Sequence, residues 1–126
     1  MQVKFCRDGH HVHDFIRELV IDTGIENMIT VGEMASTTLD NCINYTRPDR
    51  HELSMCFNFH HLKVDYRDGN KWALMPPDLN MLRNIFKEWQ ESMSLHDGWS
   101  AVFWCNHDQP RIVSRFGDEG DRKSVV

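Results

Sequence analysis

An acidic residue and a histidine follow the most apolar stretch of the sequence. Residues 99–105 form an apolar, strand-like run, and after a single asparagine come His107 and Asp108. A second carboxylate, Glu33, follows the short apolar run 28–31. Folds with buried parallel strands present reactive side chains just past the C-terminal ends of those strands. We therefore expect Glu33 and Asp108 to lie in one shared site.

Two carboxylates that converge on one pocket are what cleavage of a glycosidic bond requires. A protonated acid serves the leaving oxygen, and an anion faces the oxocarbenium-like centre. Metal-assisted hydrolysis is a less supported alternative. Each residue also has a simpler interpretation, since Glu33 follows Gly32 and could face solvent, and Asp108 could cap the segment 111–116.

Lysines and histidines indicate a binding site less strongly than the two carboxylates do. Lys63 and Lys71 flank the polar segment after the second predicted strand and could hold an anionic group of a substrate as point charges. The histidines cluster at positions 10–13 and 60–61, but neither set has the His-Glu-x-x-His spacing of a zinc site. We expect no metal and no cofactor.

The apolar spacing predicts three helices and three strands in alternation. Helices are expected over 13–21, after a Thr37/Asp40 capping box, and after the cap residue Asp78. Strands are expected over 28–31, 53–59 and 99–105, and they are separated by turn signals such as Asp-Gly pairs.

This order predicts an α/β fold with right-handed crossovers and a parallel sheet of about three strands. A closed (β/α)8 barrel needs roughly 250 residues, so the chain of 126 residues corresponds to a partial TIM-type barrel in a single segment. An open sheet of this size leaves two unpaired edges. The chain alone is therefore expected to be marginally stable or to associate with itself through those edges.

Charge, hydropathy and cysteine spacing indicate which classes of partner and which cell compartment to expect. The net charge of −5 is spread along the chain, without the basic stripe that would follow a phosphate backbone, so nucleic acid is not expected as a partner. No window reaches membrane-spanning length. The four cysteines are widely spaced and form no Cys-x-x-Cys pair, which favours free thiols in a reducing cytoplasm.

Several segments together resemble the alpha-amylase superfamily of glycoside hydrolases, over about residues 8–120. Within it, the resemblance is strongest to the trehalose-6-phosphate hydrolases, with the oligo-1,6-glucosidases as near relatives. The matching segments are Ile-Thr-Val-Gly-Glu-Met (29–34), Ser-Thr-Thr-Leu (36–39), Phe-Asn-Phe-His-His-Leu-Lys-Val-Asp-Tyr (57–66), Phe-Trp-Cys-Asn-His-Asp-Gln-Pro-Arg (103–111) and Val-Ser-Arg-Phe-Gly-Asp (113–118).

The resemblance implies a retaining alpha-glucosidase on a (β/α)8 barrel. It places Glu33 as the general acid/base, and His107 and Asp108 as the pair that binds sugar hydroxyls and stabilises the transition state. Lys63 and Lys71 fall where the phosphate of a small phosphorylated sugar is bound. The Gly-Phe-Arg-x-Asp motif that carries the family's nucleophile does not occur in these residues. We therefore expect the chain alone to be inactive, because a retaining mechanism needs that nucleophile. The alternatives left open are an oligo-1,6-glucosidase segment and a non-catalytic fragment that binds sugar or associates with itself.

Overall fold

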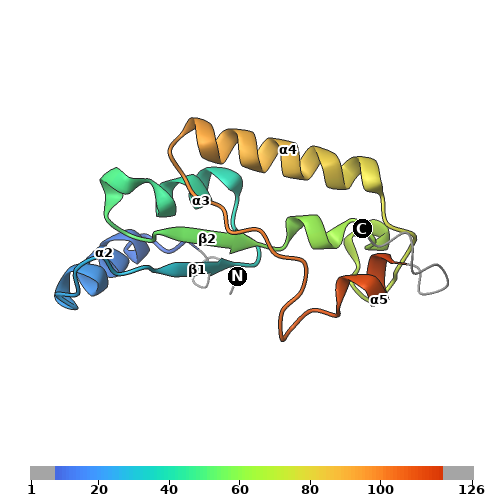
Figure 1. The fold of residues 1–126 in the computed structure, drawn as a ribbon, viewed down its shortest axis with the longest axis horizontal. Coiled ribbons are helices and arrows are strands. Elements are labelled where there is room, and N and C mark those ends of the chain that lie inside the picture. Colours follow the sequence, from blue (N-terminus) through green and yellow to red (C-terminus); the bar gives the residue numbers. More distant parts are fainter. Residues whose placement is uncertain (1–7, 118–126) are drawn as a thin grey trace.

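The computed structural model describes residues 8–117, in which helices and short parallel strands alternate (Figure 1). The predicted positions Cys6 and Asp118 lie outside these residues. Between the longer elements run three 3-10 helices, η1 (Pro48–Arg50), η2 (His60–Lys63) and η3 (Arg67–Gly69). The longer elements are α2 (Val12–Asp22), β1 (Val31–Met34), α3 (Leu39–Thr46), β2 (Met55–Asn58), α4 (Leu79–Leu95) and α5 (Ile112–Phe116).

The sheet is parallel, as predicted, and the first strand lies later in the sequence than expected. β1 pairs with β2 in a register that sets Glu33 opposite Phe57. The strand predicted over 28–31 is displaced because the carbonyl of Thr30 accepts hydrogen bonds from the amides of Ser54 and Met55, at 3.1 Å each, so the ladder begins only at Val31. Glu33 consequently lies within β1 and not after its end.

The third predicted strand is reduced to one parallel bridge. Ser100 pairs with Cys56 on the side of β2 away from β1. The carbonyl of Trp99 accepts from the Cys56 amide at 3.1 Å, and the Ala101 amide donates to the Cys56 carbonyl at 2.8 Å. Beyond this point the chain leaves the sheet and runs toward α5 (Figure 1). The apolar run 99–105 therefore lies beside the sheet without extending its ladder.

The core lies on one face of the sheet, where α3 and α4 pack (Figure 1). Five buried side chains form it, and partly buried Met34, Leu39 and Ile85 pack against them. Because strand side chains alternate between faces, the core face of β1 carries Met34 and the opposite face carries Val31 and Glu33. The five buried members are Cys42, Ile43, Cys56, Trp89 and Met93.

The helix caps follow the predicted chemistry with one change of residue. Asp78 caps α4, as predicted, and its side chain accepts from the amides of Asn80 and Met81. In α3 the cap is Thr38 and not Thr37, because the helix starts one residue later than expected and the Thr38 hydroxyl accepts from the Asn41 amide at 3.3 Å. Thr37 is instead buried, with its hydroxyl 3.7 Å from the sulfur of Met34.

Within residues 8–117, no helix combines the length and the apolar character needed to cross a membrane.

Candidate functional site

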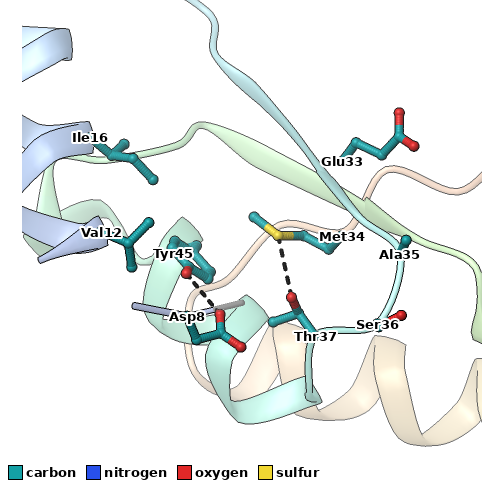
Figure 2. A pocket seen from close by; sticks show the side chains of 9 residues that line it. All are labelled: Asp8, Val12, Ile16, Glu33, Met34, Ala35, Ser36, Thr37 and Tyr45. Carbon is teal, nitrogen blue, oxygen red and sulfur yellow. Dashed lines mark hydrogen bonds between the residues drawn. The ribbon is translucent and has the colours of Figure 1, made fainter. Parts of the chain in front are cut away.

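Glu33 lies at the rim of a pocket of about 430 Å³ at the end of β1 (Figure 2). Its side chain is exposed and points away from that of Met34, as alternation along a strand requires. The carboxylate is therefore on the sheet face that α3 and α4 leave uncovered. The other residues lining the pocket are Asp8, Val12, Ile16, Met34, Ala35, Ser36, Thr37 and Tyr45.

A buried phenol forms part of the same pocket. The hydroxyl of Tyr45 donates a hydrogen bond to a carboxylate oxygen of Asp8 at 2.8 Å (Figure 2). Burial raises the pKa of Tyr45, and the hydrogen bond to Asp8 adds to the increase. Tyr45 is thus held as a neutral donor that joins the start of the described chain to α3.

His107 and Asp108 lie in an exposed tight turn. The Asp108 amide donates to the side-chain oxygen of Asn106 at 2.9 Å, and the Gln109 amide donates to the Asn106 carbonyl at 3.2 Å. The imidazole of His107 lies 3.4 Å from the Asp108 carboxylate, and the two side chains are 81% and 61% exposed. The turn fixes the backbone, and both functional groups are open to solvent.

Asp108 and Lys71 line one pocket of about 410 Å³. In its wall the ammonium of Lys71 lies 4.6 Å from the centre of the Trp72 ring, close enough for a cation–π contact. We name this cavity the Lys71–Asp108 pocket. Its remaining lining residues are Tyr66, Leu74, Gln109, Pro110, Ser114 and Arg115.

The side chain of Lys63 reaches the end of β1, the strand that carries Glu33. Its ammonium donates to the carbonyl of Ala35 at 3.1 Å, two residues beyond Glu33. The structure thus groups Lys63 with the end of β1 and Lys71 with Asp108, while Glu33 and Asp108 line different pockets. The chain leaves the sheet after Ala101 and runs toward α5 (Figure 1), so Asp108 does not lie at the end of a strand paired with β2.

The paired histidines are packed among aromatic rings. His61 Nε2 lies 2.6 Å from the Phe103 carbonyl oxygen, and its ring contacts Phe86 and Phe103 at centroid distances of 5.2 and 5.4 Å. The ring of His60 lies 4.9 Å from that of Trp89. Burial lowers the pKa of both imidazoles. Among residues 8–117, no three His, Cys, Asp or Glu side chains gather in a group that could hold a metal ion.

Two buried carboxylates with basic partners were not identified from the sequence. Arg115 Nε and Nη2 donate to the two oxygens of Asp65 at 2.7 and 2.6 Å. The buried carboxylate of Glu52 contacts His13 Nδ1 at 2.6 Å and Arg50 Nε at 3.0 Å. Glu52 and His13 are 39 residues apart and Asp65 and Arg115 are 50 apart, and partners so far apart leave no periodic signal.

Comparison of the sequence with known proteins identifies the family of this chain. The model of the alpha-amylase catalytic domain matches residues 2–126. The trehalose-6-phosphate hydrolase of Bacillus subtilis is 55% identical over 118 residues, which are 92% of this chain and 21% of that protein. The probable oligo-1,6-glucosidase 2 of the same organism is 41% identical over 123 residues, covering 96% of this chain and 22% of the relative.

A solved structure agrees with the sequence relatives. The crystal structure of Bacillus licheniformis trehalose-6-phosphate hydrolase superposes with a TM-score of 0.85 at 54% identity, over 90% of this chain and 20% of that one. The chain thus spans about one fifth of the length of the relatives it matches. The parallel α/β unit is part of a TIM-type barrel, as predicted. The chain belongs to the alpha-amylase family.

Proposed function

We propose that this chain supplies part of the active site of a retaining alpha-glucosidase that hydrolyses trehalose 6-phosphate to glucose and glucose 6-phosphate. The observation that carries the proposal is the higher identity to a trehalose-6-phosphate hydrolase, 55%, than to an oligo-1,6-glucosidase, 41%. The alpha-amylase family match supports glycosidic cleavage in general. The phosphorylated substrate is a more specific inference that depends on the difference in identity.

In this proposal Glu33 is the general acid/base. It donates a proton to the leaving glycosidic oxygen while a carboxylate nucleophile attacks the anomeric carbon, and it later removes a proton from the water that releases the second glucose unit. An acid protonated near neutral pH needs burial or a neighbouring anion. Glu33 is exposed in this chain, so in the whole enzyme we expect further parts of the barrel to bury it.

Asp108 and His107 are proposed to bind sugar hydroxyls and to stabilise the positive charge of the transition state. Both are exposed in a hydrogen-bonded turn, so they are available to a substrate. The nucleophile is proposed to come from residues other than these 126, because no Gly-Phe-Arg-x-Asp motif occurs here. Hydrolysis by the isolated chain is therefore expected to be absent.

Lys63 and Lys71 are the proposed contacts of the phosphate. An ammonium group acts as a compact point charge toward a phosphate oxygen, and its long stem lets it turn from its present partner to a ligand. Lys63 now donates to a backbone carbonyl and Lys71 lies against Trp72.

The proposed location is a reducing cytoplasm. It is supported by the buried Cys42 and Cys56, which are free thiols and form no disulfide.

A graft into a relative tests the acid/base assignment. Residues 8–117 would replace the matching segment of the Bacillus subtilis trehalose-6-phosphate hydrolase, and release of glucose from trehalose 6-phosphate would be measured. We expect the graft to be active, and Glu33→Gln to reduce kcat by at least about a hundredfold because general acid catalysis contributes that much. Glu91→Gln, at an exposed position of α4, is the control and should leave the rate unchanged.

The isolated chain is the second arm of this experiment. Glucose release by the purified chain that disappears in Glu33→Gln would contradict the expected inactivity. A folded graft that cleaves isomaltose but not trehalose 6-phosphate would favour the oligo-1,6-glucosidase alternative, which the 41% identity keeps in view.

The same graft tests the phosphate contacts. Lys63→Ala is expected to raise the KM for trehalose 6-phosphate by about tenfold, because a charge-assisted hydrogen bond is worth roughly 1.5–3 kcal/mol. Hydrolysis of an unphosphorylated chromogenic alpha-glucoside should be unaffected. Lys87→Ala, an exposed lysine of α4, is the control. Equal effects on both substrates would remove Lys63 from the phosphate site.

A further inference from the structure

A buried ion pair lies in the wall of the Lys71–Asp108 pocket, where Arg115 is one of the lining residues. The guanidinium of Arg115 and the carboxylate of Asp65 are joined by two hydrogen bonds of 2.7 and 2.6 Å, and their side chains are only 9% and 3% exposed. The two-pronged geometry of Arg fits a carboxylate in one orientation, so this pair fixes direction as well as distance.

Arg115 also holds the turn that carries Asp108. Its Nη1 donates to the side-chain oxygen of Gln109 at 3.2 Å, and its Nη2 donates to the carbonyl of Leu62. Gln109 follows Asp108 directly, and its amide closes the turn onto the Asn106 carbonyl. One guanidinium therefore ties the Asp108 turn to the segment that follows β2.

Asp65 holds the opposite wall of the pocket through its backbone. Its carbonyl accepts from the Met75 amide at 2.9 Å, and the Arg67 amide donates to the Ala73 carbonyl at 2.8 Å. Tyr66 and Leu74 form an antiparallel bridge in the same hairpin. This hairpin presents Lys71 and Trp72 to the pocket, so both walls are anchored at Asp65.

We propose that Asp65 and Arg115 are a pair of positioning residues that sets the separation of the Lys71 wall and the Asp108 turn, and thereby the affinity of the pocket for a sugar phosphate. The ligand class rests on the proposed function. The pocket of about 410 Å³ is large enough for a monosaccharide phosphate. Arg115 lines the pocket while its guanidinium holds Asp65, Gln109 and the Leu62 carbonyl, and Asp65 is not among the lining residues.

Gln109→Ala tests the proposal with little risk to folding, because it leaves the buried ion pair intact. Glucose 6-phosphate would be titrated into the 126-residue chain, with the amide resonances of Lys71 and Asp108 followed by NMR. We expect about a threefold to tenfold weaker affinity, the equivalent of one hydrogen bond, at an unchanged unfolding midpoint. Gln90→Ala, an exposed position of α4, is the matched control.

Arg115→Lys keeps the charge and removes the two-pronged geometry. We expect a larger loss of affinity than in Gln109→Ala. A merely structural role predicts instead that Gln109→Ala binds like the parent and that affinity in Arg115→Lys falls only as far as the folded fraction does. That result would overturn the proposal.

A measurement without ligand separates this inference from the proposed function. Hydrogen exchange of the Met75 and Gln109 amides should accelerate more in Arg115→Lys than exchange of the Cys56 amide, which is bonded in the sheet. If the parent chain binds no glucose 6-phosphate, the sugar-phosphate assignment fails and exchange alone decides the positioning role. Equal acceleration at all three amides, or a parent chain without dispersed resonances, would overturn the inference.

Discussion

In the sequence, His61 was weighed as one of a pair of histidines that could bind a metal. In the structure its side chain is packed among aromatic rings. Its ring lies against Phe86 and Phe103 and 5.8 Å from Trp104, and Nε2 donates to the Phe103 carbonyl. His61 therefore holds part of the 99–105 run beside η2, while His60 packs against Trp89 of α4. Burial disfavours the charged imidazole, which is the main reason that the pKa is lowered.

This environment predicts a loss of stability in weak acid. His60 and His61 have pKa values below 6.5 in the folded chain, so the unfolded chain binds more protons as the pH falls below 6.5. The contribution of these two histidines to the free energy of unfolding is present above this range and should decrease from pH 6.5 toward pH 5. Urea unfolding at several pH values measures it.

Substitutions separate the two histidines from other titrating groups. His61→Gln removes one of the groups with a lowered pKa and should flatten the decrease below pH 6.5. His10→Gln, at an exposed histidine, should retain the parental slope. Equal slopes in both variants would show that the pH dependence comes from other groups.

At the scale of elements, α4 depends on its N-terminal cap. Asp78 accepts hydrogen bonds from the amides of Asn80 and Met81 at 3.0 and 2.9 Å. Its negative charge also interacts favourably with the positive N-terminal end of the helix dipole. Asp78→Ala should lower the free energy of unfolding by about 1 kcal/mol, within a range of roughly 0.5–2. Chemical denaturation of the variant checks this value.

The conservative replacement at the same position is the control. Asp78→Asn keeps a side-chain oxygen that caps well, so it should recover most of the lost stability. If Asn and Ala destabilise α4 equally, the cap hydrogen bonds are not the source of the effect.

The same elements show which features the sequence could predict. The α4 cap, the helix periodicity and the parallel alternation are local or topological signals, and all three agree with the structure. The start of β1 and the loss of the third strand depend on pairing with Ser54, Met55 and Cys56, which periodicity cannot show.

The candidate site divides in the same way. Glu33 and Asp108 stand out by their positions after apolar runs. The Asp65–Arg115 pair that anchors the walls of the Lys71–Asp108 pocket joins residues 50 apart in sequence. Separation of that size follows from the tertiary fold, so only the structure could reveal which side chains hold the turn in place.

At the scale of the whole molecule, the helices within residues 8–117 cover one face of the sheet. α3 and α4 bury the core face, while Val31 on the opposite face remains 52% exposed. α2 has no buried residue and leaves Phe15 and Leu19 65% and 56% exposed. Among residues 8–117 no strand pairs with the outer edge of β1. An apolar face next to an unpaired edge favours association.

We therefore expect the chain of 14.9 kDa to associate with itself as its concentration rises. Sedimentation equilibrium should give an average mass above that of the monomer. Val31→Lys places a charge on the edge strand, where lysine discourages pairing, and should shift the equilibrium toward monomer. Leu95→Lys changes an apolar side chain that is 79% exposed at the end of α4, away from this edge, and should leave the average mass unchanged. A folded parent chain that stays monomeric at all concentrations would contradict association through the β1 edge, and equal effects of the two substitutions would place the contact elsewhere.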